Sequence, residues 1–299
     1  MRQIFCPVCT EKAPPNQGEN SLVACKNCGV SWTFIPNELD TDALYEDEVY
    51  SVVDNRNSIF ERIIFFEAGR ILSGAERLLR SNSRKLLDFG SGKGQFLWEA
   101  LKRGWKGIGI ETAKDRAQFA RDKYKVSVLS EFYEGGKVKE GDFDLISLNH
   151  VLEHLPEPMK LLDELFSQNL KPGGIIYIEV PRANSWQAKM AGSEWMHWDI
   201  PKHLTHWTEP ILLNEMFKRG YKIRDDRRFS VHLGVLGMLQ AIFSFLGYRE
   251  NLILGLKRKK SPILLFTVVL LSPIALLLET LACLFNRGGI LGVYFSLDV

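Results

Sequence analysis

The residues best suited to chemistry lie in one short run, residues 86–94, where an apolar stretch leads into an acid and three alternating glycines. The acid is Asp88, and the glycines are Gly90, Gly92 and Gly94. Glycine has no Cβ, so such a turn lets a ligand approach the backbone at the carboxyl end of a strand. The spacing differs from the G-x-G-x-x-G fingerprint of pyrophosphate sites, and a carboxylate favours a cationic ligand. The run predicts a site for a cationic small molecule; the alternative is a structural turn with a solvated acid.

A second acid, Glu111, directly follows a predicted strand at residues 106–110. Because parallel strands end at the same edge of a sheet, Glu111 is expected to lie near Asp88. A carboxylate in that place can accept hydrogen bonds from both hydroxyl groups of a ribose. The two acids and the glycine turn together predict a pocket for a positively charged nucleoside.

The run at residues 86–94 resembles the first motif of the class I S-adenosylmethionine-dependent methyltransferase superfamily, and Glu111 resembles its ribose-binding acid. In that family the glycine turn wraps the methionine and ribose portions of the cofactor. The resemblance covers residues 79–229 and implies S-adenosylmethionine as the cofactor. It implies that the cofactor is bound in part by Asp88, Gly90, Ser91, Gly92, Gly94 and Glu111.

Two further stretches extend the resemblance. The run around residue 149 is similar to the family's fourth-strand motif, in which the residues that match Asn149 and His150 lie beside the cofactor. The adenine-flanking position of the family matches Glu131 and Phe132. Near its end the fourth-strand motif has two polar residues, Glu153 and His154. They either take part in the active site or have a structural role in holding the loop.

Residues 195–208, here called the histidine loop, contain three histidines and three tryptophans. Histidine can accept a proton near neutral pH, which an acceptor atom must lose when it is methylated. The loop is similar to a stretch of zinc-containing sugar C-methyltransferases whose histidine is a proposed base, and His203 is the matching residue. A lysine stands where those relatives have a glutamate, and His206 replaces a tyrosine. The resemblance implies a catalytic role for His203, with His206 as a second candidate; the alternative is that they order the loop.

Four of the five cysteines form two C-x2-C pairs, which are Cys6 with Cys9 and Cys25 with Cys28. This spacing is typical of a tetrahedral zinc site, and four thiolates without an open position predict a structural metal. We therefore expect a zinc ribbon at residues 1–35, with the segment between the pairs folded as a hairpin. The alternatives are two unrelated thiol pairs or a redox pair, although neither pair opens a βαβ unit.

From residue 85 onward, short apolar strands alternate with longer amphipathic segments, which favours a parallel sheet with helices on both faces. The predicted fold is α/β, with a doubly wound, mostly parallel sheet of the class I methyltransferase type. A linker and helical cap at residues 36–80 precede the methyltransferase domain at residues 81–299. The predicted strands are residues 85–89, 106–110, 126–129, 143–148, 175–179, 221–229 and 289–297, and the predicted helices are residues 60–80, 96–103, 113–124 and 158–169.

An apolar helical insert is predicted at residues 231–285, between the last two strands. Its apolar runs, 231–247 and 262–285, are long enough to consider for a bilayer, and the basic cluster at 257–260 suits anionic headgroups. Because the flanking strands pair in one sheet, the insert must return to the side from which it starts. We therefore expect peripheral membrane contact, as a shallow hairpin or a surface helix; the alternative is a soluble lid.

These features predict an S-adenosylmethionine-dependent methyltransferase for a small or lipid-linked acceptor, such as a saccharide or a quinone-like head. No secretory signal opens the chain, so we expect a cytoplasmic, membrane-associated protein. The formal net charge of +2 and the absence of a basic stripe argue against a nucleic-acid partner. The rival hypothesis is a catalytically silent scaffold that uses the zinc site and the insert for assembly.

Overall fold

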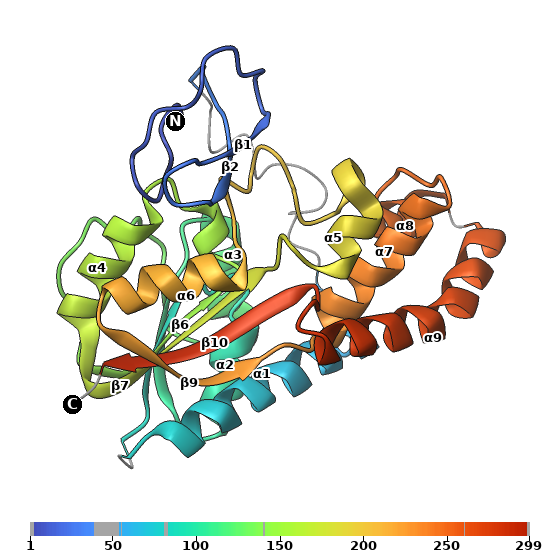
Figure 1. The fold of residues 1–299 in the computed structure, drawn as a ribbon. Coiled ribbons are helices and arrows are strands. Elements are labelled where there is room, and N and C mark those ends of the chain that lie inside the picture. Colours follow the sequence, from blue (N-terminus) through green and yellow to red (C-terminus); the bar gives the residue numbers. More distant parts are fainter. Residues whose placement is uncertain are drawn as a thin grey trace.

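The computed structural model describes residues 3–38, 54, 56–80, 83–139, 141–259 and 261–297. A central sheet is covered by helices on both faces, with a small N-terminal ribbon at the top and a helical arm at the side (Figure 1). Most of the predicted linker lies outside the described residues. The helical cap that follows it is α1 (Ile59–Leu78), which begins after the side-chain cap Ser58.

Seven strands form the central sheet: β3 (Lys85–Phe89), β4 (Lys106–Ile110), β5 (Val128–Leu129), β6 (Phe143–Asn149), β7 (Leu170–Pro181), β9 (Tyr221–Arg227) and β10 (Ile290–Leu297). Their order is β5-β4-β3-β6-β7-β10-β9. The first five pair in parallel, and β10 lies antiparallel between β7 and β9. The predicted doubly wound, mostly parallel α/β fold is confirmed, including the pairing of the last two strands.

The side chains of successive strand residues point to opposite faces of the sheet, which divides the core into two layers. Leu86 and Leu145 point to one face, while their neighbours Leu87 and Ile146 point to the other, as the period of two requires. The first face is covered by α1, α2 (Gln95–Lys102) and α3 (Lys114–Phe119), and the second by α4 (Pro158–Asn169) and α6 (Glu209–Lys218). Burial on both faces explains why these strands read as continuous apolar runs.

The predicted helix at residues 113–124 is divided into α3 and a wider π-helical turn, Ala120–Tyr124. This turn brings the Tyr124 hydroxyl to the Glu61 carboxylate of α1, to which it donates a hydrogen bond. The predicted strand at 126–129 is shortened to β5. The contact of the π-helical turn with α1 depends on tertiary packing, which no local pattern specifies.

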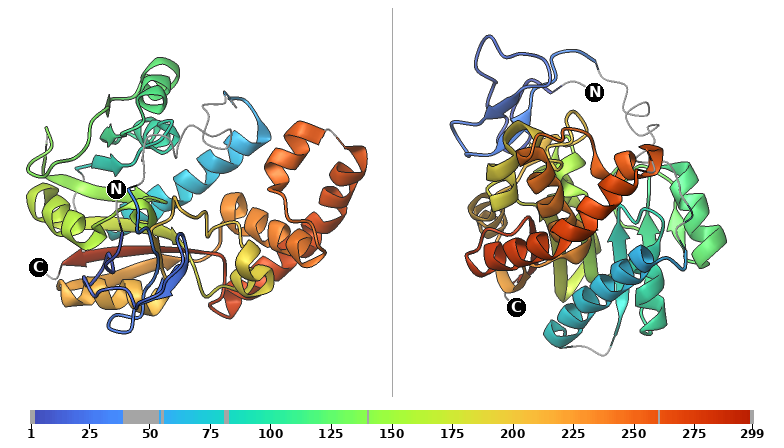
Figure 2. Two further views of the ribbon diagram at one scale, coloured as in Figure 1. Left: turned by 90° about the horizontal axis from the view of Figure 1, so that it is seen from above. Right: turned by 90° about the vertical axis from the view of Figure 1, so that its right-hand side faces the viewer.

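The N-terminal ribbon belongs to a separate three-stranded sheet of β1 (Leu22–Ala24), β2 (Ser31–Thr33) and β8 (Thr205–His206). The hairpin of β1 and β2 encloses the second cysteine pair, so the prediction of a hairpin between the two pairs is wrong. The third strand comes from the histidine loop and pairs antiparallel with β2. Figure 2 shows the ribbon at one end of the methyltransferase domain, where β2 pairs with β8.

Thr33 is the main polar link between the ribbon and the histidine loop. Its backbone N–H donates to Leu204 O at 3.0 Å, and its hydroxyl donates to His203 O at 2.6 Å. The same hydroxyl oxygen lies 3.1 Å from His206 Nε2. Since a hydroxyl carries one proton, the oxygen accepts from His206 Nε2–H. Thr33 is fully buried, so these bonds fix the loop in place.

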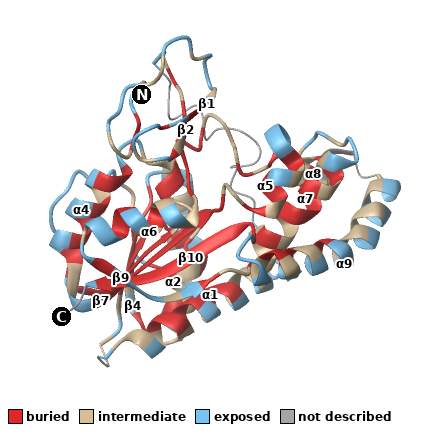
Figure 3. Cartoon of the chain, in the orientation of Figure 1, coloured by how far each residue is buried: buried red, intermediate tan, exposed pale blue. Residues whose placement is uncertain are grey.

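The insert between β9 and β10 is helical, as predicted. It contains a π-helical turn (Val231–Val235), α7 (Leu236–Phe245), α8 (Leu252–Lys259) and α9 (Pro262–Leu284). α7 packs against α5 (Trp186–Ala191) and α9, which gives the arm a small apolar core of its own. α9 shows mostly exposed and intermediate residues along its length (Figure 3).

We expect Thr33→Val to lower the free energy of unfolding by about 1–3 kcal/mol. The substitution keeps the shape of the side chain but leaves the His203 carbonyl and His206 N–H without partners in a buried place. Urea denaturation measures the change, and the exposed Thr280→Val on α9 serves as the control with little effect. Equal losses in the two variants would contradict the proposed link.

Candidate active site

The glycine turn after β3 adopts backbone conformations that favour glycine. Gly90, Gly92 and Gly94 have φ angles of 72°, 52° and 78°. A Cβ on Gly90 would overlap Val151, and one on Gly94 would lie 2.8 Å from the Cβ of Ala120. A Cβ on Gly92 would meet nothing within 4 Å among the described residues. Packing thus requires glycine at the first and third positions, whereas the second borders open space that a ligand can occupy.

Two carboxylates flank this turn at the ends of neighbouring strands. The parallel register of β3 and β4 pairs Asp88 with Gly109, which places Glu111 just beyond the end of β4. Glu111 accepts a hydrogen bond from Gly92 N–H at 2.7 Å through Oε2, and from Ala113 N–H at 2.9 Å through Oε1. The second acid therefore holds the turn directly, and its remaining lone pairs can accept further donors.

Asp88 is 2% exposed and lies beneath the turn. Ser147 Oγ donates to its Oδ1 at 2.7 Å. Burial raises the pKa of Asp88 to about 7, against the hydrogen bond from Ser147 that favours the ionised form. The carboxyl group is therefore poised near neutrality, and a nearby cationic group would stabilise its charged form.

Unpaired polar atoms around the turn agree with a polar ligand. Within the part of the chain that the structure describes, the buried hydroxyls of Ser91 and Ser130 have no hydrogen-bond partner. Such groups are costly unless a ligand or water satisfies them. With the two carboxylates and the space above Gly92, they form a donor and acceptor set that fits a nucleoside with a charged tail.

The structure brings together most of the predicted cofactor residues but not all of them. Asn149 ends β6, and neither polar atom of its buried side chain has a hydrogen-bond partner within the described residues, so its predicted place beside the cofactor stays a prediction. Glu131 and Phe132 lie in the loop after β5, and Phe132 is 71% exposed. Their predicted contact with the adenine stays a prediction.

The His150 ring lies between two acids, and its predicted place beside the cofactor stays a prediction. Its ring lies 3.2 Å from Glu179 Oε1 and 3.5 Å from Glu153 Oε1. Burial alone would lower the pKa of His150, but these two acids raise it to about 9. The ring is therefore protonated at neutral pH, and it joins a buried charge network rather than acting as a base.

That network contains residues that the sequence analysis missed. Glu179 of β7 accepts from Tyr177 and Arg227, and Arg227 also lies 3.2 Å from Glu67 of α1. The sequence carried one signal for Glu179: it is an acid in a predicted strand whose other residues are apolar. Arg227 and Glu67 come from distant elements, so only the fold brings them together.

The histidine loop ends beside the short turn of Leu152–His154, where Leu204 N–H donates to Glu153 O at 2.7 Å. His203 is buried, its Nδ1 lies 2.8 Å from His197 O, and burial lowers its pKa well below the usual range. His203 is therefore neutral, with its proton on Nδ1 and its lone pair on Nε2. Burial lowers the pKa of His206 to about 3, and its Nε2–H is used by Thr33. The geometry thus favours a structural role for His206.

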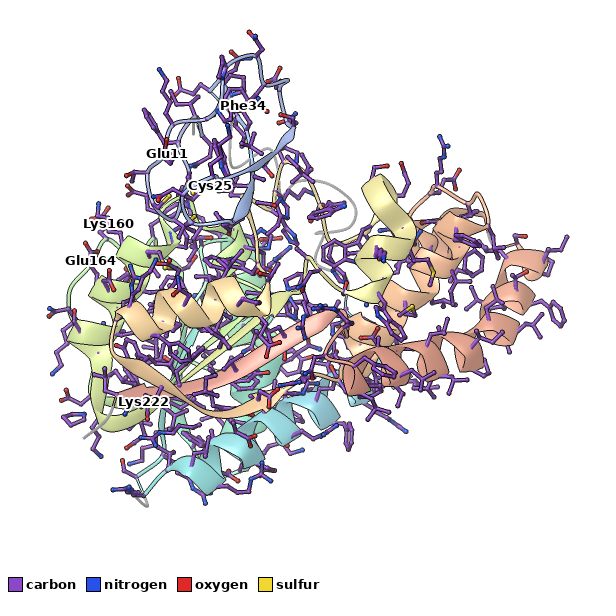
Figure 4. The ribbon with its side chains drawn as sticks, viewed as in Figure 1. Glu11, Cys25, Phe34, Lys160, Glu164 and Lys222 are labelled. Atoms are coloured by element: carbon purple, nitrogen blue, oxygen red, sulfur yellow. The ribbon has the colours of Figure 1, made fainter. Side chains whose placement is uncertain are left out.

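The four cysteines of the ribbon lie together. Their sulfur atoms are all within 4.8 Å of one another, with 3.6 Å between Cys6 and Cys28 and 3.4 Å between Cys9 and Cys25. A tetrahedral zinc ion with Zn–S bonds of about 2.3 Å places its sulfurs about 3.8 Å apart. The cluster therefore has the dimensions of a four-thiolate metal site; Figure 4 labels Cys25 within it.

Residues 63–225, more than half of the chain, match the sequence profile of the family described as "Methyltransferase domain". The chain belongs to this methyltransferase family. The predicted enzyme class, an S-adenosylmethionine-dependent methyltransferase of class I fold, is confirmed by this match and by the strand order.

Relatives with assigned names are more distant. The methyltransferase is 26% identical over 136 residues to ubiquinone biosynthesis O-methyltransferases of Escherichia fergusonii and Escherichia coli. The match covers 43% of this chain and 56% of theirs, so the chain spans just over half the length of these curated relatives.

Two solved structures share the fold at low identity. The plantazolicin methyltransferase BpumL in complex with SAH is 15% identical, with a TM-score of 0.52 over 86% of this chain and 93% of its own. Coclaurine N-methyltransferase bound to N-methylheliamine and SAH is 11% identical, with a TM-score of 0.50 over 87% of this chain and 79% of its own. These likenesses show the methyltransferase fold and leave the acceptor open.

We expect Gly92→Ala to weaken S-adenosylhomocysteine binding at least tenfold while costing only about 1 kcal/mol of stability, the strain of a left-handed alanine. Its Cβ would enter the open space above the turn. Gly90→Ala has the same backbone strain but also overlaps Val151, so it should lose several times more stability. Calorimetry and urea denaturation separate the two effects. Unchanged binding by Gly92→Ala would contradict a cofactor site at this turn.

Proposed function

We propose that this methyltransferase transfers the methyl group of S-adenosylmethionine to a small or lipid-linked acceptor at the cytoplasmic face of a membrane. The observation that carries the proposal is the pair of buried carboxylates, Asp88 and Glu111, on either side of a glycine turn that borders open space. A silent scaffold has no need of two desolvated acids there, because each costs stability unless a ligand compensates.

In the proposed site, Asp88 faces the cationic part of the cofactor and Glu111 accepts the ribose hydroxyls. Gly90, Ser91, Gly92 and Gly94 form the surface on which the cofactor lies, with Asn149 and His150 at the end of β6 and Glu131 and Phe132 on the adenine side. The cofactor supplies a methyl group bonded to a sulfonium. The protein contributes mainly by holding the acceptor atom in line with that bond.

The acceptor side is formed by the histidine loop. His203 keeps the lone pair of Nε2 in a buried place, so we assign to it the activation of the acceptor. A quinone-like phenol is one candidate acceptor, by similarity to relatives named for ubiquinone biosynthesis, and a saccharide is the other. Both are small, and both can be carried on a lipid. We propose no nucleic-acid partner.

We propose that the ribbon binds a structural zinc ion through Cys6, Cys9, Cys25 and Cys28. The ribbon buries few apolar side chains, so metal binding would supply much of its folding free energy. Because β2 pairs with β8, zinc would also stabilise the histidine loop. In this proposal residues 1–35 form the ribbon, 36–80 the linker and cap, and 81–299 the methyltransferase domain.

The membrane proposal rests on α9. Within the described residues it is the one helix long and apolar enough to cross a bilayer, and only 11% of its most apolar window is buried. Its C-terminal end is fixed to the domain, since Glu279 accepts from Gly289 N–H at 2.7 Å. We therefore propose that α9 lies on the membrane surface. Its exposed large side chains include Ile263, Leu265, Phe266, Val269, Leu270, Leu276 and Leu277.

We expect the affinity for S-adenosylhomocysteine to rise as pH rises from 6 to 8. The folded pKa of Asp88 is about 7, above its unfolded value, so ionising it costs folding free energy that grows between pH 4 and 7. A bound cationic amino group offsets this cost. Asp88→Asn should bind more weakly and without this pH dependence, and the exposed Asp163→Asn is the control. No uptake of the nucleoside by the wild-type protein would favour the silent scaffold instead.

We expect the protein to co-sediment with vesicles of phosphatidylcholine and phosphatidylglycerol, and a triple serine variant of Leu265, Phe266 and Leu270 to lose most of this binding. Each replacement removes exposed apolar area of the kind that enters the interface. Phe217→Ser, which removes a half-exposed aromatic side chain from α6, is the matched control. The membrane proposal would be overturned if the wild-type protein did not co-sediment with vesicles and instead dimerised through α9.

A further inference from the structure

The helical arm begins with a short segment that is fixed to α1. Residues 230–235, here called the arm root, form the first turn of the arm. Glu67 of α1 is buried, and its carboxylate accepts from Ser230 Oγ at 3.1 Å. The same carboxylate accepts from the backbone N–H groups of Val231 and His232. These bonds hold the arm root in one place on the methyltransferase domain.

The arm root and the end of β6 belong to one buried network of charges. Arg227 lies 3.2 Å from Glu67 and donates a hydrogen bond to Glu179. Glu179 in turn lies 3.2 Å from His150 Nε2. The backbone of the arm root is therefore connected, through three charged side chains, to the residue that directly follows β6.

The His232 ring packs on the first turn of α1. It meets the Phe60 ring edge to face, with 4.6 Å between the centroids. The next residue of α1, Glu61, accepts from Tyr124 in the π-helical turn that packs against Gly94. The ring therefore lies on a part of α1 that is close to the glycine turn.

The electrostatic surroundings of His232 agree with this position. Burial lowers the pKa of His232 to about 4, and the positive charges of His150 and Lys93 lower it further. Lys93 belongs to the glycine turn, so charges from both segments that flank the proposed cofactor act on the ring. His232 and Phe60 both keep part of their surface exposed, which leaves room for a ligand beside them.

The histidine loop also contacts the arm. A Cβ on Gly237 of α7 would lie 2.9 Å from His197 Nε2, so the buried His197 ring packs directly on the arm. Burial lowers the pKa of His197 to about 3, and the charges of His150 and His232 both act on it. Three histidines thus converge from the end of β6, the histidine loop and the arm root.

We propose that His232 is an active-site residue, which lines the space from which the acceptor reaches the methyl group of the bound cofactor. This inference rests on the proposed function, because it takes the cofactor to lie over the glycine turn. A neutral imidazole in that place can accept a hydrogen bond from an O–H or N–H group of the acceptor. The arm then has a second role besides membrane contact, since its first turn completes the methyl-transfer site.

A charge placed at residue 232 tests the proposal on the full-length protein, because S-adenosylmethionine carries a sulfonium charge that S-adenosylhomocysteine lacks. Calorimetry measures the ratio of the two affinities. His232→Arg should weaken S-adenosylmethionine relative to S-adenosylhomocysteine by about fivefold, since two positive charges would then lie close together in a poorly solvated place. His232→Gln adds no charge and should leave the ratio unchanged. Phe66→Arg is the matched control, because it adds the same charge at an exposed position of α1, where solvent screens it.

An unchanged ratio in His232→Arg would overturn the proposal, even if both nucleosides bound more weakly. If that variant does not fold, nuclear magnetic resonance of wild-type protein with labelled histidine gives a second measurement. The two nucleosides should then shift the His232 signal, identified by its absence in His232→Gln, by different amounts; equal shifts would exclude a place beside the methyl group. Wild-type protein that binds neither nucleoside removes the proposed function itself, whereas binding of both without discrimination at residue 232 removes only the role of the arm root.

Discussion

The hydrogen bond from Gly92 N–H to Glu111 is the constraint on which the site depends. It links the glycine turn after β3 to the end of β4, so the parallel register of two strands sets the shape of the cofactor surface. The same register buries Asp88 beneath the turn, where desolvation raises its pKa. In the proposed site, cofactor recognition would therefore depend on the sheet, with the glycine turn completing the surface.

The ribbon and the histidine loop form one structural unit, although 170 residues separate Thr33 from His203. β8 completes the ribbon sheet, and the loop then returns to Glu153 through the Leu204 N–H bond. Zinc in the ribbon, where bound, would restrict the loop before any acceptor arrives. A loop that is ordered in advance loses less conformational entropy when the acceptor binds. By ordering the histidine loop, the ribbon would therefore favour acceptor binding.

The sequence predicted the sheet well because each strand from residues 85–89 to 289–297 carries its own apolar pattern. The motif residues Asp88, Gly92 and Glu111 could be placed close together for the same reason, since each lies at or just after the end of a strand; their contact with the cofactor stays a prediction. The buried network of Glu67, Glu179 and Arg227 could not be predicted, because it depends on tertiary packing of α1, β7 and β9. The hairpin was misplaced because cysteine spacing fixes the metal ligands and leaves the strand pairing open.

Composition alone cannot separate a membrane-spanning helix from a surface helix, and α9 shows why the fold is needed. A single buried acid, Glu279, interrupts its apolar sequence near the C-terminal end. Its carboxylate accepts from Gly289 and from Gln187 of α5, so it ties this end of the helix to the methyltransferase sheet. A helix anchored there cannot place its whole length in a bilayer while β10 stays paired with β7 and β9. This anchoring is the reason why we propose contact along the helix rather than passage across a membrane.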